Sequence, residues 1–269
     1  MSLPGLFEVG ATLALLALCI YMATLFSNVL NLHPGRLAID NPRRESVLVL
    51  FLVAALFVVT SLLEAFRFIV YRPMFHLDTR PASIIDQFNV LYTFVFYAPW
   101  FALLFLATRR TGQKAGSLGI DGSNKRQVLA FGLSLGVVYF MVVGLFSSAF
   151  GSGFPGFSTS LIWGFLDNVI ISLSEETVWR GYIQTRLVAF GGVTKGLLMA
   201  SLLFGLLHFP QRFFMYSGAV IDSLASALLV CAAGLLFGYV MLRSQNILSS
   251  SILHLIGNWS ALFWGTSSF

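Results

Sequence analysis

Long apolar runs, separated by short polar connections, recur along the whole chain. Runs of about 20 apolar residues are typical of membrane-spanning helices, and they predict about eight spans here. The connections 71–88 and 109–126 are the longest polar ones, and the stretch GSGFPGFS predicts a Gly/Pro turn between the fourth and fifth spans. The expected limits of the spans are 6–30, 46–70, 89–108, 127–150, 159–187, 193–209, 221–242 and 247–265.

Composition supports the same fold class. The 269 residues are 57% hydrophobic and 10% charged, and the mean hydropathy is +0.85, which is too apolar for a soluble domain of this length. The first run carries Glu8 and lacks a basic segment before its apolar stretch, so we expect a retained span and not a cleaved signal peptide. We therefore expect an all-α polytopic membrane protein of about eight transmembrane helices.

Glycines and cysteines inside the apolar runs are expected to serve packing. Gly132–Gly136 and Gly234–Gly238 have GxxxG spacing, which lets membrane helices approach closely. The first pair also matches G-x-S-x-G, but a nucleophile elbow requires a strand-to-helix turn, and this match lies inside an apolar run. Cys19 and Cys231 also lie in apolar runs, so no disulfide framework is predicted.

Basic residues concentrate in alternate connections. By the positive-inside rule, the connections after spans one, three, five and seven face the cytoplasm, and both termini lie outside. The other side holds only Arg72, Arg80 and Arg212. Because the charges sit in short loops, they indicate topology, and we expect no nucleic-acid partner. The cytoplasmic set is Arg36, Arg43, Arg44, Arg109, Arg110, Lys114, Lys125, Arg126, Arg186, Lys195 and Arg243.

Ionisable residues inside the spans need a partner or a function, because a charge at bilayer depth costs several kcal/mol. Glu64 and Arg67 are three residues apart and predict a local ion pair, with Arg67 reaching toward the interface. Asp222 opens the seventh span, where a helix N-terminus stabilises an anion. Asp167 and Asn168 precede a further charged cluster by about two turns. They are either structural or part of the lining of the same cavity.

That further cluster is ISLSEETVWRGY, residues 171–182. Glu176 and Arg180 stand at i, i+4 on a helix and are expected to neutralise each other. Glu175 is rotated by one position, so it faces elsewhere without a local cation. One interpretation is an internal ion pair beside an adventitious second carboxylate. The other is that Glu175 has a chemical function.

Polar residues on two later spans favour the second interpretation. His208 lies in the sixth span, and His254 and Asn258 share one helix face in the eighth. At about 1.5 Å per residue, Glu175, His208 and His254 lie roughly 18, 22 and 11 Å from the cytoplasmic helix ends, so they can meet near the midplane in a cavity that we expect to open to the cytoplasm. A carboxylate and an imidazole can activate a shared water, and a second His with an Asn can stabilise an oxyanion. Alternatively, the Glu and the two His can hold Zn²⁺.

The motifs Glu175-Glu176-Thr-Val-Trp-Arg180, Phe204-Gly-Leu-Leu-His208 and His254-Leu-Ile-Gly-Asn258 occur in this order on successive late spans. This ordered set resembles the CPBP (Abi) family of CAAX prenyl proteases and bacteriocin-processing enzymes, over about residues 125–265. The resemblance implies an intramembrane catalytic cavity within a single membrane domain, 1–269. Three N-terminal spans and their loops would then form 1–126, and a catalytic core would form 127–265.

The resemblance also implies roles for these residues. Glu175 would be the general base, with His208 helping to activate the water, and His254 and Asn258 would stabilise the oxyanion. A further set would hold the architecture. We expect a glutamate mechanism that requires no metal cofactor, with zinc as the alternative. The residues expected to hold the architecture are Glu176, Arg180 and Phe204.

The function expected from these residues is an intramembrane endopeptidase. It would cleave a membrane-anchored peptide or protein near its C-terminus, within the lipid bilayer of a prokaryotic inner membrane. Two alternatives remain at this point. A proton-coupled transporter or channel also uses buried Glu and His, but its inverted repeat and broken helices are not evident in the sequence. The second is a non-catalytic CPBP-like scaffold or immunity protein.

Overall fold

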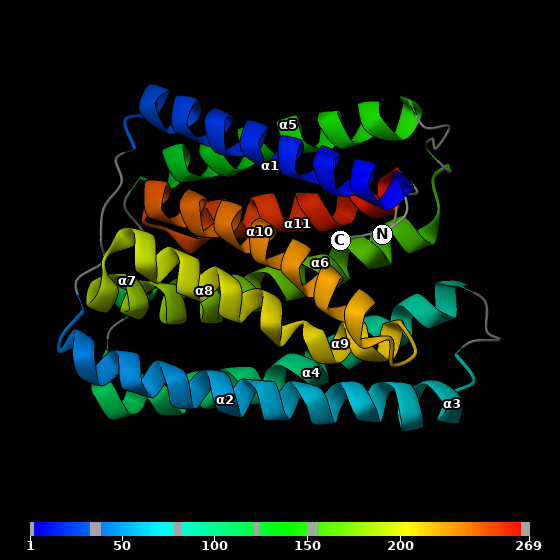
Figure 1. Cartoon of the computed structure of the whole chain (residues 1–269), viewed down its shortest axis with the longest axis horizontal. Helices are drawn as coiled ribbons and strands as arrows, with labels where there is room; N and C mark the ends of the chain where they lie inside the picture. Colours follow the sequence, from blue (N-terminus) through cyan, green and yellow to red (C-terminus); the bar gives the residue numbers. More distant parts are fainter. Residues whose placement is uncertain are drawn as a thin grey trace.

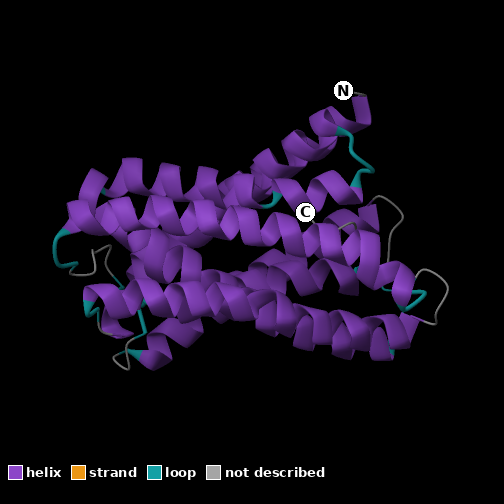
Figure 2. Cartoon of the chain, turned by 90° about the horizontal axis from the view of Figure 1, so that it is seen from below, coloured by secondary structure: helices purple, strands orange, loops and turns teal. Residues whose placement is uncertain are grey.

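A computed structural model of the chain describes residues 3–32, 39–77, 82–113, 115–120, 124–149, 154 and 156–264. These residues form helices joined by short turns and contain no strand (Figure 2). The helices are α1 (Leu3–Val29), α2 (Pro42–Phe66), η1 (Arg67–Tyr71), α3 (Arg72–Met74), α4 (Ala82–Thr111), η2 (Ala115–Leu118), α5 (Lys125–Ala149), α6 (Thr159–Glu176), η3 (Thr177–Gln184), α7 (Thr185–Gly191), α8 (Val193–Leu207), α9 (Phe209–Met215), α10 (Val220–Ser244) and α11 (Ile247–Phe263).

Each predicted span corresponds to one helix or to a run of consecutive helices. The second span continues from α2 through η1 and α3, the fifth runs from α6 through η3 into α7, and the sixth continues from α8 into α9. Five described helical segments are long and apolar enough to cross a membrane, and two shorter apolar helices accompany them. The prediction of an all-α polytopic membrane protein is confirmed. The long segments are Pro42–Met74, Ile84–Thr111, Lys125–Ser148, Val193–Met215 and Val220–Ser244.

The helices that carry the three motifs lie in the middle of the bundle. In Figure 1, α1 and α5 cover one side, α2 and α4 cover the opposite side, and α6, α8, α10 and α11 lie between them. Helix α11 packs against α5 and α6, α10 packs against α8 and α1, and α4 packs against α6. The helices that carry the motifs thus lie between the two outer pairs, and five of the motif residues are buried: Glu175, Glu176, Arg180, Phe204 and His254.

The GxxxG glycines lie where helices approach closely. A methyl group added to Gly234 would lie 3.1 Å from the Phe204 ring of α8, and one added to Gly132 would lie 3.0 Å from the backbone oxygen of Ser249 on α11. Both distances are tighter than ordinary van der Waals contact. The interpretation of these glycines as packing positions is confirmed, and neither pair lies at a strand-to-helix turn.

The connections expected to be cytoplasmic gather at one end of the bundle. The C-terminal ends of α1, α4, α7 and α10 lie at that end, on the left of Figure 1, and those of α3, α5 and α9 lie at the other. We call the first the basic end. The side chains of Arg36, Arg80, Lys114 and Glu8 lie outside the described residues, as does most of the predicted Gly/Pro turn.

Two of the basic residues do more than indicate topology. Arg186 is fully buried and its Nε lies 3.6 Å from a carboxylate oxygen of Glu45, on α2. Arg243 is also buried, and its Nε donates to Ser27 Oγ, on α1, at 2.6 Å. From the sequence, both residues are predicted to be loop charges, because their partners lie far away along the chain.

Candidate active site

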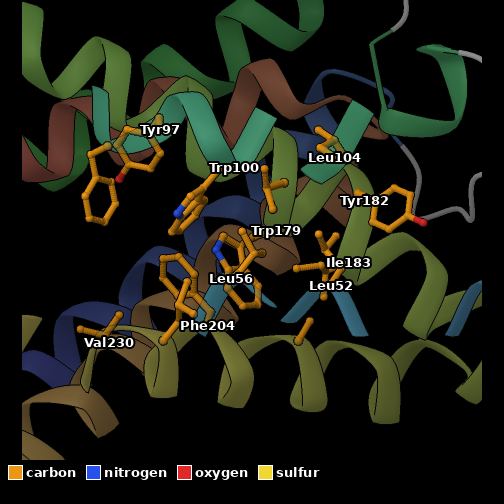
Figure 3. Close-up of a cluster of buried hydrophobic side chains, with 14 of the residues drawn as sticks. Leu52, Leu56, Tyr97, Trp100, Leu104, Trp179, Tyr182, Ile183, Phe204 and Val230 are labelled. Carbon is orange, nitrogen blue, oxygen red and sulfur yellow. The ribbon is translucent and has the colours of Figure 1, made fainter. Parts of the chain in front are cut away.

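A buried cluster of large apolar side chains forms the scaffold of the site. It joins α2, α4, η3 and α8, and it includes Leu56, Trp100, Trp179, Ile183 and Phe204 (Figure 3). Trp179 and Phe204 meet edge to face, with ring centroids 5.4 Å apart. Large interlocked rings leave few alternative rotamers, so the polar groups beside them are held in fixed positions.

The helix that carries the glutamates changes its winding directly after them. Helix α6 ends at Glu176, and Thr177–Gln184 form a π-helical segment, η3. Such segments are rare and occur frequently at functional sites. Gly181 lets the η2 turn approach η3, because a methyl group there would lie 2.8 Å from the backbone oxygen of Leu118. A regular helix was expected over this stretch, and the sequence pattern contains no signal for the wider turn.

Glu176 and Arg180 form the ion pair that their spacing predicts. The Arg180 Nη1 atom lies 3.3 Å from Glu176 Oε1, and both side chains are almost completely buried. The guanidinium also stacks on the Phe204 ring, 4.2 Å from its centroid, and donates to the backbone oxygen of Gly234 at 3.4 Å. These contacts tie η3 to α8 and α10.

Glu175 has a different environment. Its side chain is 7% exposed, and the Nε2 atoms of His208 and His254 each lie 3.9 Å from it, facing Oε1 and Oε2 respectively. Oε1 accepts a hydrogen bond of 2.5 Å from the Tyr97 hydroxyl. Oε2 is buried and has no hydrogen-bond partner among the described residues. Glu175 is within electrostatic range of the guanidinium groups of Arg180 and Arg212. The expectation that it lacks a nearby cation is therefore wrong, because these arginines approach it through the packing of the helices.

Both imidazole rings are oriented by a contact at Nδ1. The Nδ1 atom of His208 lies 2.8 Å from the backbone oxygen of Phe204, and that of His254 lies 3.0 Å from Glu176 Oε1. A carbonyl or carboxylate oxygen only accepts, so Nδ1 carries the proton in each ring. The other ring nitrogen, Nε2, faces Glu175 in both residues. The His254 ring also stacks on Phe237, with centroids 4.5 Å apart.

His254 therefore connects the two adjacent glutamates. From the sequence, the two glutamates are expected to have separate roles: Glu176 stabilises the fold, and Glu175 is the general base. In the structure Glu176 also orients His254, whose other nitrogen faces Glu175. The contact joins residues 78 positions apart, so helical periodicity alone does not predict it.

Asn258 lies one turn after His254 on α11, and it is partly buried. The hydrogen bonds of the described residues do not join it to Glu175, His208 or His254. The structure thus brings together three of the four residues expected at the reacting centre. Asn258 shares a helix with His254.

Glu175 and His208 line a cavity of about 70 Å³. Its opposite wall comes from α2, η1 and α4, helices that lie before residue 126. The polar wall residues include Glu64 and Arg67, which form the predicted local pair at 3.8 Å, with Arg67 23% exposed. The sequence did not predict that this pair borders the same cavity. The other wall residues are Thr60, Tyr92, Thr93, Phe96, Tyr97, Trp100, Ile171, Leu207 and Gln211.

The cavity extends away from the basic end. Arg67, in η1, and Gln211, in α9, line it in the half of the bundle remote from that end (Figure 1). Tyr97 and Trp100, which line the cavity, also belong to the apolar cluster that contains Leu56 and Trp179 (Figure 3). The opening toward the cytoplasm stays a prediction.

Asp167 borders a second, separate cavity. That cavity measures about 340 Å³ and is also lined by Asp86 and Asn168. The Asp167 carboxylate is hydrogen-bonded to Thr93, a residue of the first cavity's wall. Asp167 is thus adjacent to the cavity of Glu175 but does not line it. Asp222 lies in the first turn of α10, as expected.

The zinc alternative can be compared with the geometry. The ligand types are suitable, and both rings direct Nε2 toward Glu175. However, the described residues contain no group of three His, Cys, Asp or Glu side chains placed closely enough to hold a metal ion. No step below depends on a metal ion.

One site residue was missed by the sequence. Tyr97 lies on α4, inside an apolar run with no charged neighbour, and only its contact with Glu175 distinguishes it from other span tyrosines. Its helix belongs to the N-terminal spans, to which no diagnostic motif is assigned.

The comparisons with known proteins agree with the motifs. The family model described as "Type II CAAX prenyl endopeptidase Rce1-like" matches residues 157–260. This segment contains every motif residue from Glu175 to Asn258, so the resemblance to the CPBP family is confirmed, and it supports an intramembrane endopeptidase in general terms. No curated protein and no solved structure matched the chain.

Proposed function

Because residues 157–260 match the Rce1-like prenyl endopeptidases, we propose that this chain hydrolyses a peptide bond near the C-terminus of a membrane-anchored or lipidated substrate. The observation that carries the proposal is the environment of Glu175. It is a buried carboxylate with one unpartnered oxygen, it faces two imidazole nitrogens, and it borders a cavity.

The first step activates a water. A water in the cavity beside Glu175 donates one hydrogen to Oε2 and the other to the unprotonated Nε2 of His208. Glu175 takes the proton as the water oxygen attacks the scissile carbonyl carbon. The C=O bond becomes a C–O⁻ single bond in a tetrahedral intermediate.

The second step expels the amine. The protonated Glu175 gives its proton to the departing nitrogen as the C–N bond breaks and the carbonyl re-forms, which restores the carboxylate. His254 and Asn258 are proposed to donate hydrogen bonds to the oxyanion. His254 donates from Nε2 only when both ring nitrogens carry protons, and it has a carboxylate at each of them, Glu176 and Glu175.

The proposed setting follows from the charge pattern and the spans. The basic end would face the cytoplasm of a prokaryotic inner membrane, and the lipid bilayer would deliver the substrate laterally. No metal cofactor is required in this mechanism. The Glu176–Arg180 ion pair and the contact between Arg180 and Phe204 would keep the two imidazole rings in position.

The test is a comparison of membrane proteomes from cells that carry the wild type or Glu175→Ala. Uncleaved precursors are expected to accumulate in the variant, and their C-terminal peptides would identify the substrate. Asp222→Asn, an exposed carboxylate at a helix start, is the matched control and should leave the proteome unchanged. An unchanged proteome in Glu175→Ala cells, with the variant folded in the membrane, would overturn the proposal.

A further inference from the structure

The Tyr97 hydroxyl is bound to Glu175 by a short hydrogen bond. The distance from the hydroxyl to Oε1 is 2.5 Å, and both side chains are buried. Because an ionised carboxylate only accepts, Tyr97 is the donor. Tyr97 lies on α4, outside the segment 157–260 that matches the prenyl endopeptidases. Neither the motifs nor the family match assigns it a role.

This hydrogen bond makes the two oxygens of Glu175 unequal. Oε1 is occupied by Tyr97, whereas Oε2 is buried without a partner and lies 3.9 Å from His254 Nε2. Fixing one oxygen also fixes the rotation of the carboxylate about its last torsion, which is otherwise broad. The free oxygen, Oε2, is therefore held toward His254, while Oε1 stays between Tyr97 and His208.

Tyr97 is itself held rigidly. Its ring meets Phe96 and Trp100 edge to face, with centroids 5.1 and 5.0 Å away. A nearby tyrosine of the same helix uses its hydroxyl differently. Tyr92 donates to the backbone oxygen of Leu63 at 2.6 Å, which is an ordinary structural contact. Tyr97 directs the same group to the proposed base.

We propose that Tyr97 is a positioning residue for the hydrolysis, whose hydroxyl holds Glu175 Oε1 so that Oε2 accepts the proton of the water. This inference rests on the proposed function. It also gives the N-terminal spans a defined task, because the catalytic cavity is incomplete without α4.

The test compares Tyr97→Phe with Tyr182→Phe, using a farnesylated CAAX peptide as the probe. Tyr182 is a matched control, since its buried hydroxyl also donates to a glutamate, Glu45 Oε2, at 3.3 Å, away from the cavity. Tyr97→Phe is expected to lower kcat by about 10- to 100-fold, the effect of losing one hydrogen bond to a charged group, with KM within about twofold. Tyr182→Phe is expected to keep the wild-type kcat.

A second pair of variants separates the hydrogen bond from packing. At position 97, p-aminophenylalanine keeps a donor, whereas p-fluorophenylalanine keeps the ring and fills the space without one. The first is expected to retain kcat within about tenfold of the wild type and the second to lose it as Phe does. Equal kcat values for the two folded variants would overturn the inference.

Glu175→Gln in the same assay distinguishes this failure from failure of the proposed function. If Glu175→Gln is inactive and Tyr97→Phe is fully active, the role of Tyr97 is wrong and the endopeptidase proposal stands. If Glu175→Gln cleaves the probe like the wild type, the proposed function itself is wrong.

Discussion

Two buried glutamates in this bundle share one kind of partner, a tyrosine, and differ in their other partners. Glu45, near the start of α2 at the basic end, and Glu175, near the middle of the bundle, each accept a hydrogen bond from a buried tyrosine, Tyr182 and Tyr97 respectively. Glu45 also has Arg186 at 3.6 Å and accepts from the Gln113 amide at 3.4 Å. Glu175 instead faces two imidazoles, and one of its oxygens has no partner.

The difference shows which feature of a buried carboxylate indicates chemistry. The Glu45 cluster is electrically balanced, because Arg186 supplies a full positive charge and stacks on Tyr182 with its guanidinium 4.2 Å from the ring centroid. Arg186 also ties the cluster to the η2 turn, through the backbone oxygen of Ser117 at 2.8 Å. Glu175 instead faces two imidazoles, side chains that can gain or lose a proton near neutral pH, and it borders a cavity. Burial and a tyrosine contact are common to both sites, so they do not identify the active one.

The largest effect is expected from Glu175→Gln. The amide cannot take a proton from water, so cleavage of the farnesylated CAAX peptide should fall by about 10²- to 10⁴-fold. The side chain keeps its size and its contact with Tyr97, so thermal unfolding of the purified protein should change little. Cleavage at more than a tenth of the wild-type rate would contradict the role of Glu175 as base.

Glu45→Gln should produce the converse result. Removing one partner of a buried ion pair leaves Arg186 uncompensated, which typically costs about 3–5 kcal/mol of stability. The unfolding temperature in detergent should therefore drop, whereas cleavage per folded molecule should stay at the wild-type level. An inactive but stable Glu45→Gln protein would show that the basic end takes part in the reaction.

A smaller effect concerns the side of the membrane from which each region can be reached. Gln211→Cys, on the cavity wall, should react with a membrane-impermeant maleimide added on the side opposite the basic end. Asp40→Cys, exposed at the basic end, should react only from the other side. Both are made in a background in which Cys19 and Cys231 are replaced by alanine. Labelling of both positions by reagent added on the side of the basic end would show that the cavity opens there.

The smallest effect is expected from metal removal. Chelator treatment should leave cleavage unchanged, and metal analysis of the purified protein should find no stoichiometric zinc. Loss of activity with a chelator, restored by added Zn²⁺ and abolished in His208→Ala, would assign Glu175, His208 and His254 to a metal site.

Much of the fold was predictable because each span is a local signal. An apolar run of about 20 residues marks a helix regardless of its neighbours, and the Glu176–Arg180 pair follows from helical spacing alone. Counting residues from the helix ends also placed Glu175, His208 and His254 at overlapping depths. Helix rise is constant, so depth along parallel helices can be compared without knowing how they pack.

The features that escaped prediction depend on how helices rotate against one another. Tyr97 reaches Glu175 only because α4 packs against α6 with one particular face, and an all-apolar span shows no preferred face in its sequence. The Glu45–Arg186 pair joins two distant spans for the same reason. The π-helical turn after Glu176 also escaped prediction, because the residues themselves are compatible with an ordinary helix.

The most direct measurement is cleavage of the farnesylated CAAX peptide by Glu175→Gln and Glu45→Gln in one assay, with each rate divided by the folded fraction of that variant. The account predicts that Glu175→Gln is folded and inactive, and that Glu45→Gln is less stable and retains the wild-type rate per folded molecule. Wild-type cleavage by folded Glu175→Gln would contradict it.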